Sequence, residues 1–99
     1  MNQTTSDDRI TREDGESGGR WVYRADGAEA AMTYSRLGTS KIIVDHTGVP
    51  DAFRGQGVGL ALAERMVADM RSEGMRVIAL CPFVKAQAQR HPDWADVIE

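Results

Sequence analysis

The first half of the chain alternates apolar and polar residues with the period of two that is typical of β-strands. Residues 20–25 are rich in aromatic and β-branched side chains, and residues 29–37 place alanine, methionine and tyrosine at every second position. The Asp-Gly pair between these segments favours a tight hairpin, because both residue types tolerate a positive φ. A short edge strand at residues 9–14, followed by a turn at residues 15–19, completes the predicted antiparallel meander.

A further strand is predicted at residues 41–47, which contain an Ile-Ile-Val run. Successive apolar residues suit a strand that is buried on both faces, at the centre of a sheet rather than at its edge. Strict alternation along this strand predicts that Asp45 points to the face opposite to Val44 and His46.

From residue 58 onward the apolar residues take the period of an amphipathic helix. They recur every four positions, at Val58, Leu62, Met66 and Met70. Gly74 is placed to end this helix in a left-handed conformation that a residue with a Cβ would resist. An apolar strand is predicted at residues 75–80. The strand-helix-strand order implies a right-handed crossover, which makes this strand parallel to the one before the helix.

A second helix is predicted to begin at Pro82, since the fixed φ and missing N–H of proline suit a first helical turn. It ends near Arg90, because the His-Pro pair that follows disfavours helical geometry before the proline. Residues 93–99 then form a short tail anchored by Trp94.

These elements predict an α/β (α+β) fold. Its mixed sheet of about five strands consists of an antiparallel N-terminal meander and then a parallel β-α-β crossover, with two helices. Ninety-nine residues suit one small domain, which we expect at residues 9–99. Residues 1–8 are small and polar, and we expect a disordered N-terminal tail there.

Composition narrows the classes of function without naming one. Twelve basic and fifteen acidic side chains give a formal charge of −3, which lacks the basic excess of a nucleic-acid binder. The single cysteine excludes an internal disulfide and fits a reducing compartment. No apolar run resembles a signal peptide or approaches the roughly 20 residues that span a bilayer. We therefore expect a cytoplasmic protein without membrane or nucleic-acid partners, and a monomer or weak homodimer.

The segment between the third long strand and the first helix is the strongest candidate for a binding site. It reads Arg54, Gly55, Gln56, Gly57, Val58 and Gly59. The first N–H groups of a helix lack intrahelical partners, and the helix dipole adds about half a positive charge there. Three glycines let the backbone approach a ligand closely, and Arg54 can add a charge-assisted contact. This combination predicts a cradle for phosphate.

Other interpretations compete for this loop. A dinucleotide fingerprint needs the spacing G-x-G-x-x-G, whereas these glycines stand at alternate positions. A P-loop needs a Gly-Lys-Ser/Thr sequence, which is absent. A flexible turn into a helix, without any ligand, remains open as an alternative.

The spacing Arg54-x-x-Gly57-x-Gly59 resembles the pyrophosphate-binding motif of the GNAT superfamily of N-acetyltransferases. Together with residues 45–47, Pro50, residues 81–84 and residues 90–94, it resembles the minimal single-domain GNAT-like proteins called YjdJ-type. This resemblance covers roughly residues 20–97. It implies acetyl-CoA as cosubstrate, with the pyrophosphate on the loop N–H groups and the pantetheine along the preceding strand. The implied cofactor-binding residues are Val44, Asp45, His46, Thr47, Arg54, Gly55, Gln56, Gly57, Val58, Gly59 and Cys81, and no metal is implied.

Two residues are candidates for catalysis. Cys81 immediately precedes the helix that Pro82 opens, a position that favours an ionised thiol. Three roles are open for Cys81. It acts as a nucleophile that takes the acetyl group, it lines the pocket without reacting, or it is a small hydrophobic residue of the core. His46 is a base for the acceptor ammonium or a structural histidine. The YjdJ-type resemblance implies His46 as base and Cys81 as nucleophile or pocket residue, with both near each other at the ends of adjacent parallel strands.

Three functions follow from these observations. The first is an acetyl-CoA-dependent N-acetyltransferase that acetylates a primary amine of unknown identity. The second is a non-catalytic acetyl-CoA or acyl-CoA-binding module, because the chain lacks the helices and final strands with which larger GNAT enzymes build an acceptor pocket. The third is a binder of a phosphate ligand unrelated to CoA.

Overall fold

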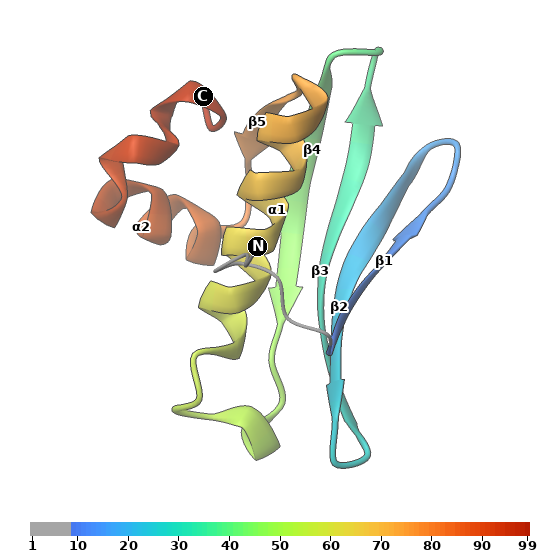
Figure 1. Ribbon diagram of the computed structural model, residues 1–99, viewed down its shortest axis with the longest axis vertical. Helices are drawn as coiled ribbons and strands as arrows, with labels where there is room; N and C mark the ends of the chain where they lie inside the picture. The colour runs from blue at the N-terminus through green and yellow to red at the C-terminus, as the bar shows by residue number, and fades with distance from the viewer. Residues whose placement is uncertain (1–8) are drawn as a thin grey trace.

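A five-stranded mixed sheet forms the framework of the protein (Figure 1). The computed structural model describes residues 9–99, so the tail expected at residues 1–8 lies outside the described residues. The strands follow one another in the sheet in chain order, and every neighbouring pair is antiparallel except β4 and β5. This topology confirms the predicted meander and crossover. The strands are β1 (Ile10–Asp14), β2 (Gly18–Ala25), β3 (Ala28–Leu37), β4 (Lys41–Gly48) and β5 (Arg76–Ala79).

Both helices cover the same face of the sheet (Figure 1). They are α1 (Val58–Glu73) and α2 (Pro82–Arg90), with short 3-10 helices η1 (Asp51–Phe53) and η2 (Pro92–Asp96). Along β3, Ala30, Met32 and Tyr34 are buried, while the residues between them keep partial exposure. The sheet therefore has a helix-covered face and an open face, and the described core lies between the covered face and the helices.

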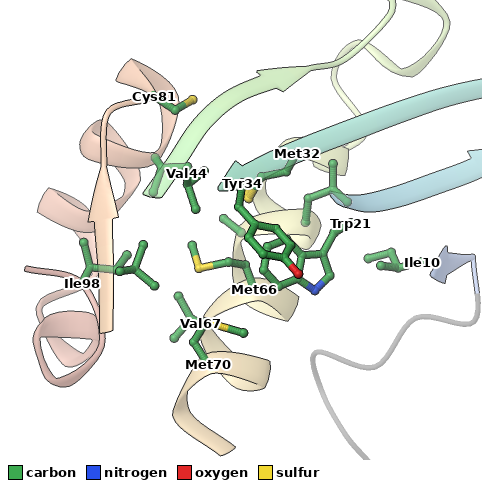
Figure 2. Packing of buried hydrophobic residues seen from close by; sticks show 14 of the residues in the cluster. Ile10, Trp21, Met32, Tyr34, Val44, Met66, Val67, Met70, Cys81 and Ile98 are labelled. Carbon is green, nitrogen blue, oxygen red and sulfur yellow. The ribbon is translucent and has the colours of Figure 1, made fainter. Parts of the chain in front are cut away.

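The helix-covered face is held by a continuous cluster of apolar side chains. Figure 2 shows Trp21 and Tyr34 of the sheet facing Met66 of α1. The rings of Trp21 and Tyr34 lie 4.9 Å apart between centroids, and Trp21 donates its indole N–H to Asp69 at 2.8 Å. Strand β2 is thus held against α1 both by apolar packing and by a hydrogen bond, because the indole N–H of Trp21 has its partner on the helix.

Helix α1 ends where the sequence predicts it. Gly74 has a φ of 69°, and the N–H of Met75 donates to the carbonyl of Met70 at 2.9 Å. Such a bond closes the last turn only when the capping residue is left-handed, and a Cβ would strain that conformation.

A β-bulge interrupts the pairing of β3 with β4. Tyr34 pairs with Val44 and Thr33 pairs with His46, so Asp45 is the extra residue on β4. A bulge places two consecutive side chains on the same face. The expectation that Asp45 points away from Val44 is correct. The expectation that it also points away from His46 is wrong, because His46 shares the open face with Asp45.

Two further segments differ from the sequence prediction. Gly18 and Gly19 belong to β2 rather than to a turn, and a Cβ on Gly18 would lie 2.2 Å from the carbonyl oxygen of Tyr34. The C-terminal tail is also more structured than expected: Ile98 forms a parallel bridge with Val77 of β5, beyond η2. Trp94 is buried as expected, and its ring stacks on His91 at 4.2 Å.

Across residues 9–99, none of the helices has the length and apolar character needed to cross a membrane.

Candidate functional site

A cavity of about 480 Å³ opens where the end of β4, the glycine loop and α2 meet. Five of the six predicted loop residues line it, and Gln56 instead donates its side-chain amide to the carbonyl of Ala52. The predicted Thr47 also lines it. The complete lining is Thr47, Val49, Phe53, Arg54, Gly55, Gly57, Val58, Gly59, Leu60, Phe83 and Gln87.

The loop presents the start of α1 to this cavity. Gly55 and Gly57 have φ values of 79° and 73°, and a Cβ at either position would meet nothing within 4 Å. Gly57 is the N-cap of α1 and supplies no side-chain hydrogen bond. The N–H groups of the first turn therefore point toward the loop without intrahelical partners, and the positive end of the helix dipole favours an anion there.

Gly59 serves the site in another way. It is buried in the first turn of α1, and a Cβ there would lie 2.8 Å from Cζ of Phe83. The third glycine of the loop is thus required by close packing of α2 against α1, and Phe83 forms part of the cavity wall as a result.

Arg54 supplies a positive charge to the lining. Its guanidinium lies 2.6 Å from a carboxylate oxygen of Asp51 in η1, and the side chains are 79% and 88% exposed. An ion pair so open to water contributes little stability, so an incoming phosphate can replace the carboxylate at small cost.

Strands β4 and β5 separate beside the cavity. Their last paired residues are Val44 and Ala79, and the carbonyl of Val44 accepts from the N–H groups of Leu80 at 3.0 Å and Cys81 at 3.1 Å. The chain then turns into α2. Residues 45–47 of β4 therefore extend beyond the paired part of β5, which is where the resemblance implies that pantetheine binds.

Cys81 faces the helix-covered side of this separation. Its thiol is buried, with 3% of the residue exposed, and donates to the hydroxyl of Thr47 at 3.4 Å. Thr47 pairs with Met32, which is fully buried on the same face. The thiol is thus adjacent to a cavity-lining residue.

His46 lies on the open face. Its strand partner is Thr33, next to Met32 and pointing the other way, and its Nε2 lies 3.3 Å from the position that a Cβ of Gly48 would take. The imidazole is exposed. The register therefore separates His46 from Cys81 across the sheet, in contrast to the proximity that the sequence suggested.

Asp45 also projects from the open face rather than into the cavity. Its carboxylate accepts hydrogen bonds from Thr33 at 2.6 Å and from Ser35 at 3.4 Å. Among the predicted cofactor residues, Asp45 and His46 thus present their backbone, not their side chains, to the covered side.

Part of the cavity wall was not predicted from the sequence. Val49, Phe53, Leu60, Phe83 and Gln87 line it without having been singled out. The spacing of Phe83 and Gln87, four residues apart at the start of α2, places them on one helix face and is the signal that could have indicated them. Phe53 is fixed by the ring of Tyr23, at 5.1 Å between centroids.

Comparison with known proteins agrees with this geometry. Residues 20–97 match the model of the GCN5-related N-acetyl-transferase family. The solution structure of a GCN5-like protein from Staphylococcus aureus superposes with a TM-score of 0.71 at 31% identity, over 93% of this chain and 90% of that one. The chain therefore belongs to the GCN5-related N-acetyltransferase family, which confirms the resemblance to the GNAT superfamily.

More distant relatives carry the name Protein NATD1. The match to that of Xenopus tropicalis is 29% identical over 63 residues, or 64% of this chain and 58% of the relative. The match to the Homo sapiens protein is 27% identical and covers 64% of this chain and 56% of the relative. This chain thus matches little more than half of the length of these relatives.

Proposed function

We propose that the protein is an acetyl-CoA-dependent N-acetyltransferase that transfers an acetyl group to a primary amine. The observation that carries this proposal is the cavity formed by the glycine loop, beside the separation of β4 from β5, in a chain of this family. The chemistry of the loop suits a diphosphate, since the start of α1 and Arg54 both belong to the cavity lining.

In this proposal the cofactor lies on the helix-covered face. The pyrophosphate binds the first-turn N–H groups of α1, and pantetheine runs along the unpaired edge of β4 toward Thr47. The apolar walls given by Phe53 and Phe83 exclude water from the pantetheine arm. The thioester then reaches the gap between the two parallel strands.

In this proposal the transfer is a direct attack. The neutral amine adds to the thioester carbonyl carbon and forms the C–N bond. The C–S bond then breaks, and CoA leaves as a thiolate that takes up a proton. His46 accepts the proton that the amine loses. Cys81 is buried beside Thr47, next to the wall of the pocket. An acetyl-Cys81 intermediate is the competing route.

A non-catalytic acetyl-CoA-binding module is the second candidate. The observation in its favour is that the described cavity accounts for the cofactor alone, while the face that carries His46 has no helix over it. For both candidate functions we predict a cytoplasmic location and a monomeric or weakly dimeric state.

Calorimetric titration with acetyl-CoA tests the binding site. A Gly57→Glu change should abolish binding, because it places a side chain and a negative charge at the phosphate cradle. Gly38→Glu is the matched control: Gly38 also has a positive φ, of 66°, and a Cβ there also meets nothing within 4 Å. Both variants thus carry similar backbone strain and the same added charge. Equal affinities of the two variants would show that the loop has been misidentified.

Incubation with labelled acetyl-CoA separates the two candidates. The enzyme should acetylate an added amine, and mass spectrometry of the intact protein should find no acetyl group on Cys81 if transfer is direct. His46→Ala should reduce transfer strongly, while Cys81→Ala should keep most of it. Binding of acetyl-CoA without transfer to any tested amine favours the module.

A further inference from the structure

We propose that the contact between Cys81 and Thr47 limits the acyl group of the cofactor to the two carbons of acetyl. The substrate is then acetyl-CoA, to the exclusion of propionyl-CoA and longer acyl-CoA thioesters. The inference rests on the proposed acetyl transfer and extends it, since it assigns the choice of acyl group to two side chains at one end of the cofactor cavity.

The direction of the cofactor determines where its acyl group lies. In the proposed function the pyrophosphate binds at the start of α1 and the pantetheine runs toward Thr47, so the thioester is the part that arrives at Thr47. Thr47 lines the cavity, whereas Cys81 does not. The Cys81 thiol donates to the Thr47 hydroxyl at 3.4 Å. The two side chains therefore stand one behind the other at this end of the cavity.

Hydrogen bonds join β4 to the end of β5 at two points. The carbonyl of Val44 accepts from the N–H groups of Leu80 at 3.0 Å and Cys81 at 3.1 Å. Three residues further along β4, the thiol of Cys81 reaches across to Thr47, and Figure 2 shows its sulfur pointing toward β4. A group that enters between the strands from the cavity thus meets the thiol contact first and the backbone bonds behind it.

The thiol belongs to the packed core. Cys81 is 3% exposed, and Met32, the strand partner of Thr47, is fully buried in the same apolar cluster. Protein interiors are packed as densely as organic crystals, so an added methylene is accommodated only by displacing its neighbours. Propionyl carries one methylene more than acetyl, and that methylene has to displace the Cys81–Thr47 contact.

Calorimetric titration of the wild type with CoA, acetyl-CoA, propionyl-CoA and butyryl-CoA tests the limit without any substitution. Propionyl-CoA should bind about tenfold more weakly than acetyl-CoA, and butyryl-CoA more weakly still. Equal affinities for acetyl-CoA and propionyl-CoA would overturn the inference alone. Failure of the proposed function looks different, since none of the four ligands would then bind, and the inference would fall with it.

The pair Cys81→Ala and Cys81→Ser tests the role of the sulfur atom. Alanine removes the atom at the γ position, so the affinity for propionyl-CoA should come within about twofold of that for acetyl-CoA. Serine keeps an atom and a donor to Thr47 at this position and should keep most of the discrimination. Full discrimination in Cys81→Ala would overturn the inference. Equal losses in both variants would also overturn it, because the γ atom would then be irrelevant.

Thr47→Ser is a second variant on the other side of the contact. It removes one methyl group from the cavity wall and keeps the hydroxyl, so it should narrow the difference between acetyl-CoA and propionyl-CoA. An unchanged difference would contradict the placement of the acyl group against Thr47.

Nuclear magnetic resonance locates the acyl group directly. The difference in amide shifts between the CoA complex and the acetyl-CoA complex isolates the effect of the acetyl group. These differences should be largest at residues 47 and 81. Differences confined to residues 54–59 would place the acyl group elsewhere and overturn the inference.

Discussion

At the scale of single residues, the glycines of the loop have different tasks that their spacing does not reveal. Gly57 needs a positive φ, whereas Gly59 is a helical residue that needs the absence of a Cβ against Phe83. The sequence predicted a glycine-rich phosphate cradle, and five of its six residues line the cavity, while the phosphate-binding role stays a prediction. It could not predict the partner of Gly59, because that contact depends on how α2 packs across α1.

A Gly59→Ala change tests this assignment. The new Cβ would meet Cζ of Phe83 at 2.8 Å, so we expect a loss of about 1–3 kcal/mol in the free energy of unfolding, as for other overpacked sites. The double variant Gly59→Ala/Phe83→Leu should recover part of this loss, because leucine vacates the contact. Denaturant unfolding of the wild type and three variants gives the coupling energy. Strictly additive effects would refute the contact.

The candidate catalytic residues show the same limit. His46 and Cys81 were identified by residue type and position, but the sequence did not predict on which face of the sheet each side chain lies. One extra residue in β4 decides the face of His46, and nothing in the local sequence marks Asp45 as a bulge, since its partner Thr33 is twelve residues away.

At the scale of elements, the sequence predicted helices and strands well wherever the apolar residues recur with a regular period. The alternation in β3 and the four-residue repeat of α1 define both elements, and Gly74 marks the helix end. Elements without a period were missed: η1 and η2 are three and five residues long, and each depends on contacts with distant segments. In η2, the carboxylate of Asp96 accepts from Arg71 of α1 at 2.7 Å.

The two elements that flank the loop make opposing electrostatic contributions. Helix α1 has no acidic residue in its first turn, which leaves its N-terminus free to attract anions, whereas η1 carries Asp51 in its first turn. Asp51 both neutralises Arg54 and repels a phosphate. Asp51→Asn should therefore tighten acetyl-CoA binding about two- to fivefold, the range of an exposed ion pair.

Calorimetry at low and moderate salt measures this effect, which should shrink as salt screens the charges. Asp26→Asn is the control, because it removes the same charge at the distant turn between β2 and β3, where asparagine tolerates the φ of 52°. Equal gains in both variants would assign the effect to net charge rather than to η1.

At the scale of the whole molecule, ion pairs join β1 to α1 and to the neighbouring strand β2. Arg12 of β1 pairs with Glu73 at the end of α1, and Arg20 and Arg24 of β2 pair with Glu13. Hydrogen bonds from these two arginines lower the pKa of Glu13. The hydrogen bond from Arg71 likewise lowers the pKa of Asp96. Burial raises the pKa of Asp14, but bonds from Tyr34 and Arg12 outweigh it, and the net direction is downward.

These directions predict acid sensitivity. A carboxyl whose pKa is lower in the folded state stabilises the fold above its unfolded value, about 4, and loses that contribution as the pH falls through its folded value. The unfolding midpoint in denaturant should therefore be constant from neutral pH to about pH 5 and decline below pH 4. Asp14→Asn and Asp96→Asn should each flatten the decline. An acid limb as steep in both variants as in the wild type would contradict the assignment.

The bridge between the C-terminal tail and β5 has a consequence for how copies of this protein meet. Val77 donates its N–H to Val97 at 2.8 Å and accepts from Glu99 at 2.9 Å, so the middle of this sheet edge is already occupied by the chain's own last residues. An unoccupied edge is a template onto which a foreign strand can add. Any intermolecular strand addition at this edge must first displace the tail, which makes the tail a barrier to aggregation as well as a part of the core.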